Sequence, residues 1–479
     1  MGLQPYGVCP RFPHKPPEMF DFLAYSPKIA IISDTGAHYT YGQLQAAVDV
    51  LKPFFRKGEL AFCLCTNTPA CIMGYLALLE SGVATVLVDA RKNRDLLQGL
   101  LDIYHPNWVW GPIGAGFGEI FRQMEDYALY AYSSQQHRIH PDVALLLTTS
   151  GSTGSPKLVK LTAGNIRSNA EAIAQYLGID ASEKPVTTLP MYYSFGLSII
   201  NSHLLKGATI LLTDKTIAQR EFWDFMQEHK ATSISGVPYT YEMLKRLHFF
   251  RMSLPHLKTM TQAGGKMPAD LAREYIDFAA ANGQRFFIMY GQTEATARMS
   301  YLPWEYARDK YASIGVAIPG GRFSLRDDHD REILAPDTEG ELVFEGPGVC
   351  MGYAEGPEDL SRGDENHGIL HTGDIARFDT DGFFYITGRM KRFVKIWGNR
   401  CNLDTVEQLV HTVTSHCACV GTDDKITVFV TENGLSGSII SLLAEKTGLN
   451  ARAFEIRIVD AIPRNPSGKI QYADLQALL

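Results

Sequence analysis

The chain has 479 residues, of which 45% are hydrophobic and 20% are charged, as is usual for a folded globular protein long enough for more than one domain. Its net charge of −7 gives no basic surface, which argues against nucleic acid and anionic membranes as partners. No apolar run reaches the roughly 18 residues of a membrane span. The eight cysteines are scattered and the N-terminus lacks signal-peptide features, so we expect a reduced, cytoplasmic protein acting on small molecules.

Short apolar strands alternate with helical stretches through the first part of the chain. The predicted strands are 29–32, 60–64, 84–88, 143–147, 208–212 and 232–235, and the predicted helices are 41–51, 70–79, 163–177 and 222–229. This alternation is typical of βαβ units around a parallel sheet. From about Gly320, short strands such as 340–344 and 382–387 are separated by Gly, Pro and Asp, which indicates a β-rich subdomain.

A charged stretch at 388–395 has the composition of an exposed linker. We therefore predict an α/β fold in two parts. Residues 1–390 form a large N-terminal domain with parallel-rich sheets and the β-rich subdomain, and residues 391–479 form a small, mobile α+β domain.

The sequence TTSGSTGSPK at 148–157 follows the apolar run 143–147. Small hydroxylated residues and glycines leave backbone amides and hydroxyls free to surround an anion, and a lysine ends the stretch. The residues predicted to hold phosphate are Ser150, Gly151, Ser152, Thr153, Gly154 and Lys157. Taken alone, the stretch fits an ordinary surface turn equally well, and the GxxxxGK[ST] loop is absent.

Four later stretches carry complementary chemistry. The glycines of QAGGK (262–266) allow a flat ring to lie against bare backbone. YGQTEA (290–295) offers an aromatic ring, a hydroxyl and a carboxylate suited to magnesium. HTGD (371–374) supplies a carboxylate for ribose hydroxyls, and RNPSGK (464–469) presents a lysine on a loop. Each stretch alone is also compatible with a simple turn.

Together and in this order, these motifs resemble the adenylate-forming superfamily of acyl- and aryl-CoA synthetases, peptide-synthetase adenylation domains and luciferase-like enzymes. The resemblance covers nearly the whole chain. It implies that a carboxylate attacks the α-phosphate of ATP to give acyl-AMP and pyrophosphate, and that a thiol then takes the acyl group. ATP and Mg²⁺ are the implied ligands, with CoA or the phosphopantetheine of a carrier protein as acceptor.

The resemblance also implies roles for the motif residues in the first half-reaction. Ser150, Thr153 and Lys157 hold phosphate oxygens, Thr293 the α-phosphate, Glu294 the magnesium, Tyr290 the adenine face, and Asp374 with Arg389 the ribose. Gly264, Gly265 and Gly291 complete the ATP site. Lys469 bridges the carboxylate and the α-phosphate, where a flexible point charge on a mobile loop can arrive late.

In the second half-reaction the small domain is expected to swing about a hinge at Lys391. Gly398 then borders the thiol tunnel, where a side chain would obstruct pantetheine. Lys395 is expected to assist catalysis. Lys395 and Arg400 are explained equally well as solvent-exposed charges without a catalytic role.

The class of carboxylic acid substrate is indicated by the sequence LPMYYSFGLS at 189–198. By the resemblance, amino-acid-activating relatives carry aspartate after the phenylalanine, where Gly196 stands here, so we predict a carboxylic acid without an α-amino group. Tyr193 occupies the gating aromatic position, with a core aromatic as the alternative. Further predicted pocket residues are Gly236, Val237, Gln262, Met289, Ala297 and Arg298, the last as a polar partner of the substrate.

Three alternatives stay open at the level of sequence. The sequence ends ten residues after Lys469, so we expect any carrier protein to act in trans, and CoA serves equally well. An amino-acid-activating enzyme that loads a carrier protein is a second reading. A non-catalytic nucleotide-binding scaffold is a third, disfavoured by the intact set of Lys157, Glu294, Asp374 and Lys469.

Overall fold

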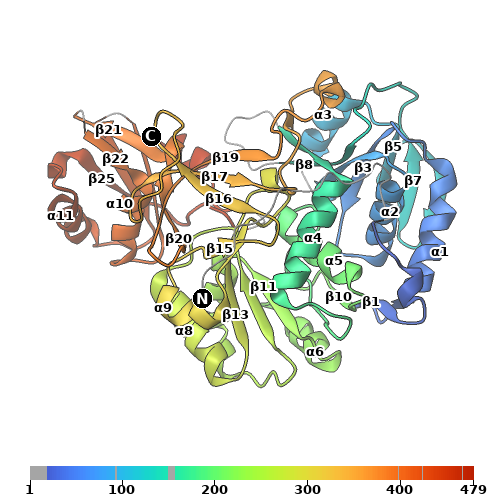
Figure 1. The fold of residues 1–479 in the computed structure, drawn as a ribbon, viewed down its shortest axis with the longest axis horizontal. Helices are drawn as coiled ribbons and strands as arrows, with labels where there is room; N and C mark the ends of the chain where they lie inside the picture. The colour runs from blue at the N-terminus through green and yellow to red at the C-terminus, as the bar shows by residue number, and fades with distance from the viewer. Residues whose placement is uncertain (1–18, 92–93, 149–156, 398, 423, 466–467) are drawn as a thin grey trace.

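The computed structural model describes residues 19–91, 94–148, 157–397, 399–422, 424–465 and 468–479 (Figure 1). In these ranges no helix has the length and apolar character needed to cross a membrane.

The largest sheet has eight strands in the order β18-β9-β8-β4-β3-β5-β7-β6. Strands β3, β4, β5 and β8 run parallel, and the others pair antiparallel. The bounds are β3 (Leu60–Cys65), β4 (Ala84–Asp89), β5 (Trp108–Pro112), β6 (Glu119–Met124), β7 (Tyr127–Ala131), β8 (Val143–Thr148), β9 (Leu158–Thr162) and β18 (Tyr353–Ala354). Strand β3 is buried along its whole length, as expected for a central strand covered on both faces.

Helices α1 (Tyr41–Leu51), α2 (Pro69–Glu80), α3 (Arg94–Tyr104), α4 (Ala163–Leu177) and α5 (Ser194–Leu205) lie with this sheet (Figure 1). Thr40 and Thr162 are the N-cap residues of capping boxes at the start of α1 and α4. These capping boxes satisfy backbone N–H groups that the first helical turn leaves unpaired. Helix α5 is buried at eleven of its twelve positions, so it runs through the interior rather than over the surface.

A second sheet, β11-β12-β13-β14-β15, has a parallel core of β11 to β13. Its bounds are β11 (Ser233–Gly236), β12 (Thr259–Gln262), β13 (Arg285–Tyr290), β14 (Ser300–Tyr301) and β15 (Val316–Ala317). The accompanying helices are α6 (Arg220–Glu228), α7 (Pro238–Arg246), α8 (Ala269–Ala281) and α9 (Ala307–Lys310). A small sheet, β10-β1-β2, joins β1 (Ile29–Ser33), β2 (His38–Thr40) and β10 (Ile210–Leu212).

The predicted β-rich subdomain is an antiparallel sheet, β16-β17-β19-β20. Its strands are β16 (Arg322–Arg326), β17 (Gly340–Glu345), β19 (Ile369–Phe378) and β20 (Phe384–Arg389). In Figure 1 this sheet lies between the large sheet and the C-terminal part of the chain.

The last part has its own apolar core, built around Val406, Val428 and Ile439. It contains a hairpin, β21 (Phe393–Ile396) and β22 (Asn399–Asn402), and the sheet β23 (Cys417–Thr422), β24 (Lys425–Val430) and β25 (Phe454–Ile458). Its helices are α10 (Leu403–His411), α11 (Ser436–Thr447) and α12 (Tyr472–Gln476).

The predicted fold class is confirmed: a large α/β part with parallel-rich sheets precedes a small α+β part. The start of two predicted strands was wrong by two residues. The strand predicted at 208–212 begins at Ile210, and the one predicted at 382–387 begins at Phe384 after the turn at Gly382. The boundary at residues 390 and 391 stays a prediction.

Candidate active site

The C-terminal lysine predicted for catalysis lies against the large part of the molecule. The Nζ atom of Lys469 is 5.3 Å from the ring centroid of Tyr193. A Cβ added to Gly264 would lie 3.8 Å from Lys469 Cε and 2.6 Å from the Tyr193 hydroxyl. The loop is held by Asn465, whose Oδ1 accepts a hydrogen bond from the Lys469 amide at 2.9 Å. Residues from three distant segments therefore meet at one point.

Burial lowers the pKa of Lys469 from its ordinary value, and the nearby Arg389 charge lowers it further. The carboxylates of Glu294 and Asp374 act in the opposite direction. These electrostatic interactions place Lys469 in the field of the predicted ribose and magnesium residues.

Asp374 on β19 is buried and forms the centre of a polar network. Its carboxylate accepts hydrogen bonds from the Tyr290 hydroxyl and, at 3.0 Å, from Gln292 Nε2, and it pairs with Arg389 Nε at 3.3 Å. Burial raises the pKa of Asp374, while Arg389 and the two hydrogen-bond donors lower it. Tyr290, predicted to stack on adenine, is thus tied through its hydroxyl to the predicted ribose residue.

Tyr353 contacts both Glu294 and Lys157, and this residue was not predicted from the sequence. The Tyr353 hydroxyl donates to Glu294 Oε1 at 2.9 Å, and Lys157 Nζ lies 5.8 Å from the Tyr353 ring centroid. Lys157 also pairs with Glu355 at 2.5 Å. Tyr353 forms part of the edge strand β18, which pairs with β9 directly after Lys157, and no phosphate-loop pattern marks it in the sequence.

Thr293 is 3.2 Å from the hydroxyl of Ser194, another residue that was missed. Ser194 begins α5, which brings this helix to the YGQTEA segment. The predicted phosphate residues Ser150, Gly151, Ser152, Thr153 and Gly154 lie outside the described residues.

Three of the predicted acid-pocket residues, Tyr193, Val237 and Met289, belong to one apolar cluster beside this site. Val237 and Met289 are buried there together with Phe195, and Tyr193 packs against them. Burial raises the pKa of Tyr193 to about 12, so its phenol stays neutral. Arg298 lies against Phe195, with its Cζ atom 4.7 Å from the ring centroid.

Several predicted glycines are required by packing. Gly264 has a φ of +85° and lies under Tyr193. At Gly291 a Cβ would meet the Ala297 carbonyl oxygen at 1.9 Å, and at Gly236 it would meet Thr240 Cβ at 2.8 Å. At Gly265 a Cβ would lie 3.3 Å from Pro238, and the Gly265 carbonyl accepts a hydrogen bond from buried Gln262 at 2.8 Å.

Gly196 is also required by packing, and the class of acid inferred from it stays a prediction. A Cβ at this position would lie 2.3 Å from the Pro190 carbonyl oxygen and 3.1 Å from that of Leu189. The first turn of α5 packs on this backbone, so a side chain at 196 would be directed into it and an acidic group there would not be free to meet a substrate ammonium. Gly196 is therefore a packing glycine.

Two of the residues predicted for the second half-reaction, Lys391 and Lys395, lie in the part of the chain that the structure describes. Lys391 falls in a 3₁₀ turn at Met390–Arg392, and Lys395 lies on hairpin strand β21, paired in register with Arg400. No described contact joins Lys395 to the Lys469 group. Gly398 lies outside the described residues.

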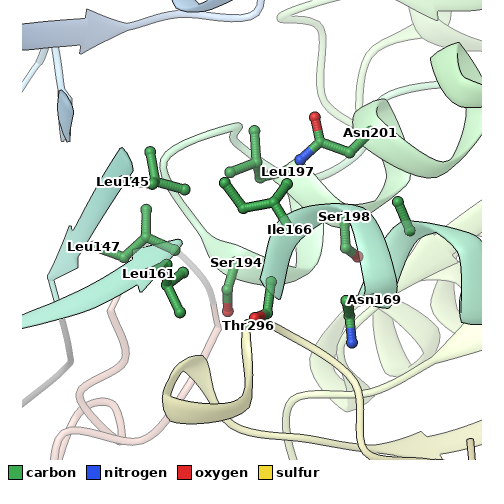
Figure 2. A pocket seen from close by; sticks show the side chains of 11 residues that line it. Leu145, Leu147, Leu161, Ile166, Asn169, Ser194, Leu197, Ser198, Asn201 and Thr296 are labelled. Atoms are coloured by element: carbon green, nitrogen blue, oxygen red, sulfur yellow. The ribbon is translucent and has the colours of Figure 1, made fainter. Parts of the chain in front are cut away.

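A cavity of about 10 Å³ lies between β8, β9, α4 and α5 (Figure 2). Leu145, Leu147 and Ile166 form an apolar side, and Ser194 and Thr296 lie near each other at another side. A cavity of this volume holds at most about one water molecule, so it is too small for an acyl group.

Comparisons with known proteins place the fold among the adenylate-forming enzymes. Residues 117–354 match the family model "AMP-binding enzyme". The chain is similar to 2-succinylbenzoate–CoA ligase from Bacillus cereus (27% identity over 447 residues; 88% of this chain, 89% of the relative). It is also similar to the putative acyl–CoA ligase YdaB from Bacillus subtilis (27% over 472 residues; 89% and 90%).

Among solved structures, o-succinylbenzoate coenzyme A synthetase from Bacillus subtilis, in complex with ATP and magnesium ion, has the same fold. Its TM-score is 0.78 at 21% identity, covering 96% of this chain and 99% of that one. Residues 117–354 thus form an AMP-binding domain within a chain of this fold.

Proposed function

We propose that this protein is an AMP-forming acid–thiol ligase. A carboxylate oxygen of the acid attacks the α-phosphorus of ATP, the bond to the bridging oxygen of pyrophosphate breaks, and acyl-AMP forms. A thiol sulfur then attacks the acyl carbon, and AMP leaves. The observation that carries the proposal is the position of Lys469 beside Tyr193 and Gly264, within the field of Glu294, Asp374 and Arg389.

The geometry supports the first half-reaction. Charge develops on the α-phosphate and on the leaving pyrophosphate, so fixed cations and hydrogen-bond donors lower the barrier. Lys469 supplies a cation beside Tyr193, and Lys157 supplies another near Glu294. We assign Thr293 to the α-phosphate, and Asp374, Arg389 and Tyr290 to the nucleoside.

Glu294 fits a magnesium ligand. One carboxylate oxygen accepts a hydrogen bond from Tyr353, and no described residue donates to the other. Such an oxygen suits a hard cation. When bound, magnesium neutralises charge on the phosphates, and a neighbour with the same fold is known with ATP and magnesium.

CoA is the acceptor that we favour, because the relatives are named CoA ligases. Lys391 as hinge, Gly398 at the thiol tunnel and Lys395 as an assisting residue are our assignments for this second step. For the acid, the segment 192–201 carries no carboxylate, which favours substrates without an α-ammonium group.

ATP–pyrophosphate exchange over a panel of carboxylic and α-amino acids tests the proposal. We expect exchange that depends on a carboxylic acid without needing CoA, and a thioester once CoA is added. ATP binding with no exchange for any acid would support a non-catalytic scaffold, and robust exchange with simple amino acids would support the amino-acid-activating reading.

A further inference from the structure

Arg298 is a buried cation that pairs with no anion among the residues that the structure describes. Its side chain is 2% exposed, and it forms no ion pair with any residue in the described part of the chain. Nη1 lies 3.1 Å from both the Tyr176 hydroxyl and the Met289 sulfur, and the buried Nε has no hydrogen-bond partner. Burying a charge in this way is costly unless a counter-ion or several hydrogen bonds offset it.

The side chains around Arg298 cannot supply that counter-ion. Burial raises the pKa of Tyr176, which keeps its phenol neutral. Burial and the Arg298 charge lower the pKa of His203 to about 4, so this imidazole is neutral as well. The Phe195 ring, 4.7 Å away, offers a cation–π contact, which offsets only part of the desolvation of a guanidinium.

The unpaired guanidinium lies close to the reacting centre. The Phe195 and Tyr193 rings are 6.3 Å apart, and Tyr193 in turn is 5.3 Å from Lys469 Nζ. Arg298 therefore lies further into the protein than the position assigned to the reacting carboxylate, and the Phe195 ring contacts both Arg298 and Tyr193. A substrate that extends from Lys469 past Tyr193 would bring its far end toward the guanidinium.

We propose that Arg298 binds a second carboxylate of the substrate, so that the enzyme activates one end of a dicarboxylic acid. This inference rests on the proposed function. The planar fork of arginine matches a carboxylate in bidentate geometry. The Met289 sulfur, a weak acceptor, contacts Nη1 of Arg298. The thioether is flexible and can change rotamer when a substrate carboxylate, a stronger acceptor, binds there.

The proposal is tested by pyrophosphate exchange with matched pairs of acids. Each α,ω-dicarboxylic acid or aromatic dicarboxylic acid is compared with its monomethyl ester and with the monocarboxylic acid of the same length. For the wild-type enzyme we expect one diacid to exceed its ester in kcat/KM by about 10- to 100-fold, the range of a charge-assisted hydrogen bond. Arg298→Met should abolish this preference while exchange with monocarboxylic acids is kept or increased.

Arg285→Met is the matched control, because Arg285 also contacts a ring, that of Phe287, and a hydroxyl, that of Thr259, but lies at the opposite end of β13. It should leave the diacid preference unchanged. Equal exchange with diacid and ester in the wild type would overturn the inference even if Arg298→Met failed to fold. A parallel loss for all acids in Arg298→Met would make Arg298 a purely structural support of Phe195 and Tyr176. Exchange with no acid at all would instead refute the proposed function.

Discussion

The Nζ atom of Lys469 lies 5.3 Å from the centre of the Tyr193 ring, although 276 positions separate the two residues in the chain. Gly468 makes this approach achievable, because its φ of +78° is one that glycine adopts freely, and a Cβ there would meet Val237 at 2.8 Å. The C-terminal loop is thus seated on the large part of the molecule, as the proposed formation of acyl-AMP requires.

Lys469→Ala should reduce ATP–pyrophosphate exchange by about 10²- to 10³-fold, because it removes one preorganised charge at the reacting phosphate. Transfer of the acyl group from supplied acyl-AMP to CoA should fall far less. Lys446→Ala, which changes an exposed lysine on α11 paired with Glu445, is the control. Wild-type exchange in the Lys469 variant would remove this residue from the adenylation step.

The exchange reaction should decline on the alkaline side at a lower pH than a solvated lysine would give. Burial lowers the pKa of Lys469 from 10.5, and a lysine carries its charge only below its pKa. Lys469→Arg keeps the charge at every accessible pH. The variant should react more slowly than the wild type, but its rate should stay constant to a higher pH. A pH–rate profile of single-turnover adenylation checks this, and identical alkaline limbs for both proteins would contradict it.

Asp374→Asn should lower kcat/KM for ATP by about 10- to 100-fold, because charge-assisted hydrogen bonds to the carboxylate are lost. The KM for the acid should change little. Steady-state kinetics with each substrate varied in turn makes the distinction, and Asp337→Asn, a change in a surface pair with Arg377, serves as control. An effect confined to the acid KM would show that Asp374 does not serve the nucleotide.

Lys157→Met should raise the KM for ATP at least tenfold if this lysine binds phosphate. Its present partner, Glu355, is 58% exposed, and exposed pairs contribute only about 0–1 kcal/mol. Glu355→Gln should therefore leave the unfolding free energy almost unchanged and lower the KM for ATP slightly. A large loss of stability in Glu355→Gln would mean that the pair is structural.

Gly196→Ala should destabilise the fold by about 1–3 kcal/mol, the usual cost of overpacking, because the new Cβ would meet the Pro190 carbonyl at 2.3 Å. Gly99→Ala on α3 is the matched control, since nothing lies within 4 Å of its added Cβ, and it should stabilise slightly. Urea unfolding of both variants measures the difference. Equal stability of the two would contradict the packing described here.

The sequence predicted the elements whose pattern depends on local periodicity. Helix α4 was predicted with both ends correct, because Thr162 caps its start and Gly178 ends it in the left-handed region. The motif carboxylates Glu294 and Asp374 were also found, and the structure brings both into the field of Lys469.

The contacts that local patterns do not encode were missed. Tyr353 reaches Glu294 from an edge strand 59 residues later, and Ser194 meets Thr293 only because α5 is buried beside the YGQTEA segment. The packing at Gly196 was not foreseen, because its neighbour across the turn, Pro190, determines the direction in which a side chain would point. Such directions follow from tertiary packing.

The most direct test of the central claim is the product analysis of one turnover by mass spectrometry, with ATP, magnesium and an acid selected by exchange, before and after CoA is added. We predict acyl-AMP and pyrophosphate without CoA, and acyl-CoA with AMP once CoA is present. Formation of ADP and phosphate, or AMP release that does not depend on the acid, would contradict the account.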